Sequence, residues 1–175
     1  TMGSGTRSMT VHLANGTYVD VGTHTAQFDL NMAFNGGVAE LKHSGNTGKV
    51  TLAGNITLGG GSQLNLHGGT GVTYALNGAS YGGGNAVLSV NADKVEFNTQ
   101  NTTILGTLRA ENNLEIYSNA NGELERSIAQ LDIANNSRVT LNERTWKTIW
   151  NIDSLTGKGE LHWNSNTTHY NTSRL

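Results

Sequence analysis

A short apolar–polar–apolar triplet recurs along most of this chain, each time beside Gly, Asn, Thr or Asp. Such alternation directs one side of a short strand toward a core and the other toward solvent. Successive triplets begin about six to eleven residues apart, which is too close for a βαβ crossover. We therefore expect an all-β chain whose strands have about three to five residues. The triplets are 11–13, 19–21, 28–30, 39–41, 50–52, 56–58, 64–66, 74–76, 88–90, 95–97, 114–116, 131–133, 139–141 and 161–163.

Helices have little room in this pattern. Only residues 123–130, with the sequence ELERSIAQ, could form one, and the Asn residues that flank this segment favour an inserted loop or a single helical turn. The ends of each triplet should face the core and its middle residue should face outward.

Two all-β architectures fit short strands at this spacing: a sandwich or barrel of antiparallel hairpins, and a right-handed parallel β-helix with three strands in each coil of about 20 to 25 residues. Hairpins require two-residue Asn-Gly or Asp-Gly turns, but most links here differ, as in the segments 53–55, 59–63 and 134–137. These links are typical of bends between the faces of a coil. The turn chemistry favours the β-helix, in which stacked Asn, Ser and Thr can form ladders.

Composition supports a thin, elongated core. Of 175 residues, 35% are hydrophobic and 14% charged, with 23 Gly, no Pro and no Cys. The absence of Cys excludes disulfides and thiol catalysis, and a net charge of −2 disfavours binding to nucleic acid. No apolar run reaches the length of a membrane helix, so we expect no membrane insertion. Residues 1–8 are expected to be a cloning scar or unstructured start, and 9–175 a single β-helix segment.

Three C-terminal segments carry a resemblance to a known family: LDIANNSRVTL at 131–141, WNIDSLTGKGELHWN at 150–164 and THYNTSRL at 168–175. They resemble the passenger of trypsin-like autotransporters, the immunoglobulin A protease and Hap-type adhesin group of Gram-negative bacteria. From residue 45 onward the repeat style is also similar. The resemblance implies a right-handed parallel β-helix that is secreted or exposed at the outer membrane, with roles in virulence and cell adhesion.

In that family a chymotrypsin-like domain carries the catalytic serine within a Gly-Asp-Ser-Gly motif. The Gly-Ser-Gly at residues 3–5 has no preceding Asp, so no catalytic residue is carried over. We expect this chain not to be an enzyme itself, whereas the resemblance makes the parent protein a candidate serine endopeptidase.

Histidine and acidic residues are the candidates for a catalytic or metal-binding site. A Ser-His-Asp triad lacks a nucleophile motif, so His12, His24, His43 and His67 are interpreted as surface or turn residues. His162 and His169 could bind a metal if brought together, but no compact ligand motif accompanies them, so they are interpreted as polar rim residues. We predict no catalytic, cofactor-binding or metal-binding residue, and no cofactor.

An alternative function is a carbohydrate-active β-helix, a polysaccharide lyase or hydrolase, which requires paired carboxylates in one groove. The densest acidic group does not fit well, since nearby arginines favour a solvated face or an inserted loop; it comprises Glu111, Glu115, Glu123 and Glu125 with Arg109 and Arg126. The glycine runs 59–61, 68–71 and 82–84 lack the lysine of a phosphate loop and are interpreted as bends. Trp146, Trp150 and Trp163 are expected to pack over the end of a coil.

The sequence therefore predicts a non-catalytic β-helical segment that displays or spaces functional regions on an exported protein. Its expected partners are host cell-surface or matrix components, or further copies of the chain.

Overall fold

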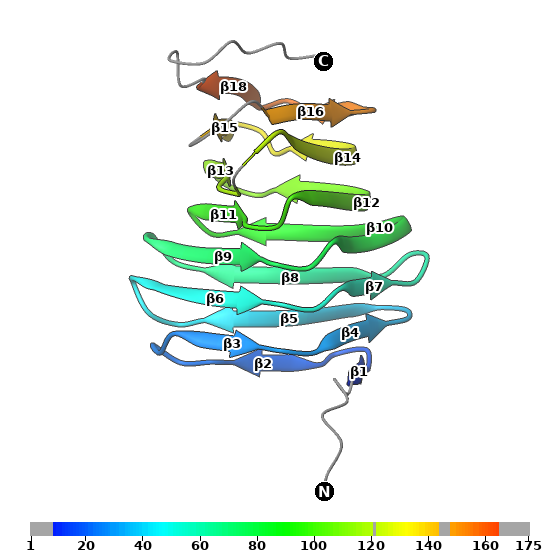
Figure 1. Ribbon diagram of the computed structural model, residues 1–175. Coiled ribbons are helices and arrows are strands. Elements are labelled where there is room, and N and C mark those ends of the chain that lie inside the picture. The colour runs from blue at the N-terminus through cyan, green and yellow to red at the C-terminus, as the bar shows by residue number, and fades with distance from the viewer. Residues whose placement is uncertain (1–8, 121, 144–147, 165–175) are drawn as a thin grey trace, which may run out of the picture.

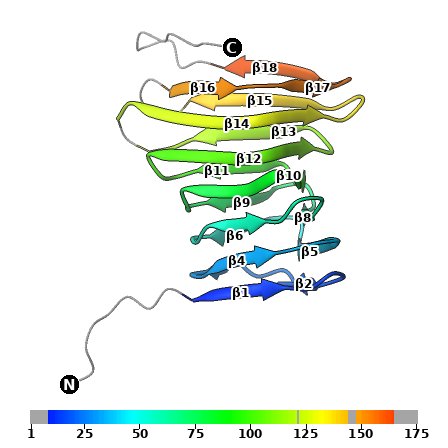
Figure 2. The same cartoon turned by 90° about the vertical axis from the view of Figure 1, so that its right-hand side faces the viewer.

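A computed structural model describes residues 9–120, 122–143 and 148–164 (Figure 1). This part of the chain is all-β, without a helix, and forms a parallel β-solenoid of about 6 turns. Figures 1 and 2 together show the chain winding upward from N- to C-terminal coil with a right-handed turn. The predicted right-handed parallel β-helix is confirmed. The expected scar at residues 1–8 lies outside the described residues.

Each coil contributes to three faces, and every strand pairing is parallel. The first face comprises β1 (Thr10–Leu13), β4 (Asn31–Phe34), β7 (Ile56–Leu58), the N-terminal parts of β10 (Ser80–Asn91), β12 (Asn101–Ala110) and β14 (Leu124–Ile133), and β16 (Thr148–Ile152). The second comprises β2 (Tyr18–Asp20), β5 (Val38–His43), β8 (Gln63–Gly68), the C-terminal parts of β10, β12 and β14, and β17 (Leu155–Gly157). The third comprises β3 (Ala26–Phe28), β6 (Gly48–Leu52), β9 (Val72–Leu76), β11 (Lys94–Phe97), β13 (Leu114–Ser118), β15 (Arg138–Glu143) and β18 (Glu160–Asn164).

The triplets set the inside and outside of the solenoid as predicted. Leu64 and Leu66 are buried while Asn65 between them is partly exposed, and Leu131 and Ile133 flank Asp132 in the same way. The register stacks aliphatic residues on one another, since Leu41, Leu66 and Val90 pair across successive coils. The core is therefore a narrow stack of aliphatic side chains along the axis.

The first two faces are joined by loops in the early coils and by the continuous strands β10, β12 and β14 further on, whereas β16 and β17 of the last described coil are again separate. The β10–β12 and β12–β14 pairings each contain a register shift at this junction. Gly106 lies there with φ 76°, and a Cβ on it would be 2.5 Å from the Ala86 carbonyl oxygen. Only glycine fits this bend without strain.

The expected loop or helical turn at 123–130 was wrong, because residues 124–130 belong to strand β14. Leu124, Arg126 and Ile128 point inward, and β14 pairs with both β12 and β16. The backbone of this polar segment forms hydrogen bonds with a parallel strand on each side. These bonds outweigh the weak intrinsic preference of its residues for a strand. The interpretation of Arg126 as a solvated residue is corrected with it.

Asparagine ladders stabilise the bends, as the sequence predicted. The Asn98 amide donates to Asn77 at 2.8 Å and accepts from Asn119 at 3.0 Å, one coil apart each time. At other bends the asparagine side-chain oxygen accepts from backbone amides instead. Asn55 Oδ1, for example, accepts from the amides of Ala79 and Ser80. These bonds satisfy polar groups that the turns would otherwise leave unpaired.

Candidate functional site

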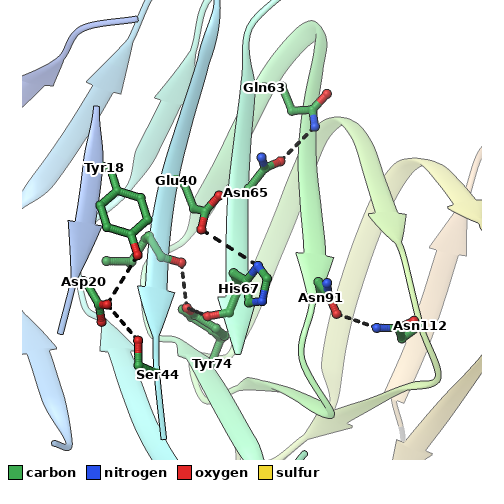
Figure 3. Close-up of polar contacts among 11 residues, drawn as sticks. Tyr18, Asp20, Glu40, Ser44, Gln63, Asn65, His67, Tyr74, Asn91 and Asn112 are labelled. Atoms are coloured by element: carbon green, nitrogen blue, oxygen red, sulfur yellow. Dashed lines mark hydrogen bonds and ion pairs between the residues drawn. The ribbon is translucent and has the colours of Figure 1, made fainter. Parts of the chain in front are cut away.

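Polar residues from successive coils align on the outer side of the second face. Their register forms a row of Tyr18, Glu40, Asn65, Ser89, Arg109, Asp132 and Thr156. Figure 3 shows the N-terminal part of this surface, where polar side chains contact one another between coils. This face carries much of the polar chemistry that the fold brings together.

Asp20 anchors the N-terminal end of this surface. Its carboxylate accepts from Ser44 Oγ at 2.7 Å, from the Gly22 amide at 2.8 Å and from the Tyr18 hydroxyl at 3.3 Å (Figure 3). The Ser44 hydrogen bond, followed by that from Gly22, lowers the pKa of Asp20. This carboxylate therefore stays ionised and holds the bend, instead of transferring protons.

Ser89, His67 and Glu40 lie near one another but do not form a catalytic triad. The His67 Nδ1 atom is 3.8 Å from Glu40 Oε1, beyond hydrogen-bond distance, although the two side chains face each other in Figure 3. Ser89 donates its hydroxyl to Glu111 Oε1 at 2.9 Å. The serine hydroxyl therefore donates to a carboxylate and not to the His67 imidazole.

The four acidic residues of the densest group do not converge. Glu111 ends the second face, Glu115 lies on the outer side of β13, and Glu123 and Glu125 are exposed at the start of the first face. Arg109 Nε lies 2.8 Å from Glu111 and 3.7 Å from Asp132. Arg109 therefore lies between two carboxylates that belong to adjacent coils.

Four adjoining clefts lie along one side of the solenoid. The first is on the second face, over β5, β8 and β10, and the other three follow the turns from the second face to the third. The backbone of these turns forms the left-hand edge of the molecule in Figure 1. Their volumes are about 230, 530, 370 and 380 Å³. Neighbouring clefts share lining residues, so they form one groove, which we call the lateral channel; the shared residues include His67, Asn91, Asp93, Asn113 and Arg138. The channel was not identified from the sequence, although its asparagines were noted as bend residues.

The histidines are scattered. His12 and His24 are exposed as expected, and His67 lines the lateral channel. His43 is buried, which corrects its interpretation as a surface or turn residue: it accepts from the Gly45 amide at 3.1 Å, and its Nε2 has no hydrogen-bond partner. Glycines at 45 and 48 leave room for its ring inside the bend.

His162 lies beside Glu160, with 3.0 Å between Nε2 and Oε2, while His169 lies outside the described residues. Within the described residues, no group of three or more His, Asp or Glu side chains could hold a metal. Nor does this part of the chain contain a helix long and apolar enough to cross a membrane.

The tryptophans divide in their roles. Trp150 is buried and its ring centroid lies 6.4 Å from that of Phe97, as expected for packing. Trp163 is 43% exposed, because β18 belongs to the last described coil, so the expected packing does not hold for it. Trp146 lies outside the described residues.

Sequence reasoning missed a buried cation. Arg126 donates to the Gln100 carbonyl at 2.8 Å, to Ser118 Oγ at 3.1 Å and to the Phe97 carbonyl at 3.3 Å. Burial lowers its pKa to about 10. Glu143 pairs in register with Ser118 one coil on, and burial raises the pKa of this carboxyl. The sequence contained a sign of this burial, since Arg126 alternates with Leu124 and Ile128 on the inward side of β14.

Comparison of the chain with protein-family models, curated proteins and solved structures gave no match.

Proposed function

We propose that this chain is a segment of an exported bacterial passenger, in which a rigid β-helix displays or spaces functional regions at the cell surface or after release. The observation that carries the proposal is the in-register stacking of parallel strands from β1 to β18. With about 4.8 Å between coils, about 6 turns extend roughly 30 Å along the axis. The resemblance of residues 131–175 adds the autotransporter setting, with a parent that is a candidate serine endopeptidase.

The same geometry favours adhesion or self-association through many weak contacts. Polar rows repeat at the coil spacing along each side, so a partner can engage several coils at once. The net charge of −2 produces little self-repulsion. The partners are host cell-surface or matrix components, or further copies of the chain.

A carbohydrate-active enzyme is the second candidate. The cleft of about 230 Å³ that brings Glu40, His67 and Glu111 to one surface favours it. The contacts of Glu111 oppose it, because Oε1 of this carboxylate already lies 2.8 Å from Arg109 Nε and accepts from Ser89 at 2.9 Å.

Two assays separate these functions. If the chain is a display segment with an adhesive role, we expect weak, concentration-dependent association in sedimentation, or binding to epithelial cells or matrix proteins. We expect no turnover of polysaccharide or peptide substrates. A monomer that binds neither would remove the adhesive role and leave only spacing. Turnover by pure protein that is abolished by Glu111→Gln would instead establish the enzyme.

A further inference from the structure

We propose that the lateral channel binds an extended, uncharged oligosaccharide along the solenoid axis. This inference rests on the proposed adhesive function and names the class of ligand that the surface would recognise. It is carried by the shape of the channel, the side chains that line it and the balance of its charges.

The channel suits a linear ligand. It follows the turns that connect β8 to β9, β10 to β11, β12 to β13, β14 to β15 and β17 to β18. Each turn lies about 4.8 Å from the next, which is comparable to the length of one sugar unit in an extended chain. An oligosaccharide lying along the channel therefore meets one turn at each sugar unit, and each of the three middle turns presents asparagine.

Side-chain amides dominate the largest cleft, which contains Asn91, Asn112, Asn113 and Asn136. An amide has two donor hydrogens and an oxygen with two acceptor sites, so it complements a hydroxyl group, which also donates and accepts. Asn112 donates to Asn91, and Asn113 Oδ1 accepts from the Arg138 amide at 2.9 Å. These contacts use only part of the hydrogen-bonding capacity of the Asn91, Asn112 and Asn113 amides, all of which line the cleft.

The channel carries charges of both signs. Asp93 accepts from the Gly71 amide at 2.6 Å, and Arg138 lies 3.1 Å from Glu160. Lys94 lies 5.8 Å from the centre of the Tyr117 ring. Because acidic and basic side chains are both present along the groove, neither a polyanion nor a polycation is attracted along its whole length, whereas the binding of a neutral polyol does not depend on these charges.

The lining is fixed before a ligand arrives. Ser137 donates through its hydroxyl to the Glu111 carbonyl at 3.1 Å and through its amide to the Ala134 carbonyl at 3.1 Å. Asn136 is the one non-glycine residue of the described chain with a positive φ, at 61°. Folding has thus already ordered these groups, which lowers the entropic cost of binding.

The test is titration calorimetry of the purified chain with cellohexaose, maltohexaose and chitohexaose, and with a hyaluronan hexasaccharide as the anionic comparison. The channel variant combines Asn112→Ala with Asn136→Gly, since glycine accepts the positive φ. The matched control is Asn98→Ala, which removes an amide from the ladder on another corner. Amide chemical shifts of the unmodified chain give a second measurement that does not depend on any variant.

We expect at least one neutral hexasaccharide to bind, with shifts at 67–71, 91–93, 112–113 and 136–138. Affinity should fall about tenfold in the channel variant and stay unchanged in the control. It should also change little between about 0.1 and 1 M salt. Binding of none of the neutral sugars, binding of hyaluronan alone, or equal affinity in the channel variant would each overturn the inference.

The two proposals fail separately. A chain that adheres to cells but binds no neutral hexasaccharide keeps the proposed function and loses the channel ligand. A chain that binds the hexasaccharide but neither cells nor matrix keeps the ligand and loses the adhesive role.

Discussion

Leu131 and Asp132 are adjacent in the sequence and lie on opposite sides of β14. Leu131 is fully buried, whereas the Asp132 side chain is 23% exposed and accepts from Thr156 at 3.1 Å. Leu131→Asp would bury an unpaired charge and should lower the free energy of unfolding by about 4 kcal/mol or more, while Asp132→Asn should change it by less than about 1 kcal/mol. Urea denaturation measures both, and equal losses would show that the assigned register is wrong.

Tyr81 links a buried side chain to the pH dependence of stability. Burial raises the pKa of its hydroxyl, which donates to the Leu52 carbonyl, from 10.0 to about 12. Between these values the unfolded chain loses this proton first, so the folded state binds more protons and stability falls as pH rises. Burial also raises the pKa of Tyr74, which adds to the same trend.

We expect Tyr81→Phe to reduce this alkaline slope by up to about 1.4 kcal/mol per pH unit between pH 10 and 12, although its stability at neutral pH is lower through the lost hydrogen bonds. Unfolding free energies measured across this range test the effect, with Tyr18→Phe on the exposed surface as the control. An unchanged slope in Tyr81→Phe would refute the assignment.

At the scale of single elements, the bends depend on ladders that connect neighbouring coils. Asn98 both donates and accepts within its ladder, so Asn98→Ala leaves Asn77 and Asn119 each without a partner. The expected loss is about 1 to 2 kcal/mol. Asn112→Ala removes an exposed amide that has one ladder partner, and should cost about 0.5 kcal/mol or less. Thermal unfolding compares the two, and similar melting temperatures would contradict a stabilising ladder.

The third face contains a contact that reaches across a whole strand. Lys49 on β6 lies 2.6 Å from Glu96 on β11, and β9 runs between them. The lysine side chain therefore crosses β9, where Ala75 is fully buried although it is the middle residue of its triplet. A small residue at this position allows a bridge over two coils, which the alternation alone does not predict.

For the whole molecule, stability should vary along the axis. β1, β2 and β3 at one end, and β16, β17 and β18 at the other, each pair on one side in the described part of the chain, whereas the central strands pair on both. In a solenoid each coil contacts only its neighbours, so opening begins at the ends.

Hydrogen exchange should show this gradient, with amides in β8 to β13 exchanging at least about tenfold more slowly than those in the terminal coils. Tyr18 and Tyr81 backbone amides are convenient reporters because they belong to the first and a central coil. Uniform protection along the axis would indicate one cooperative unit in place of a stack of coils.

The sequence by itself determined the strands that carry a triplet, the inward side of most of them and the parallel β-helix, because a period of two is a local property that each triplet carries alone. β12 and the first half of β14 contain none of these triplets and were seen only in the tertiary structure, where they pair with neighbouring strands. Only the tertiary structure decided which side chains meet, because hydrogen-bonded partners on adjacent coils are 21 or more residues apart in the sequence. Turns of unequal length also change which residues pair. The lateral channel and the separation of Ser89 from His67 belong to this second kind. The burial of Arg126 and His43 was also decided by the tertiary structure. Their residue types predict exposed side chains, but their positions in the coil bury them, and neighbouring carbonyls and amides provide hydrogen bonds.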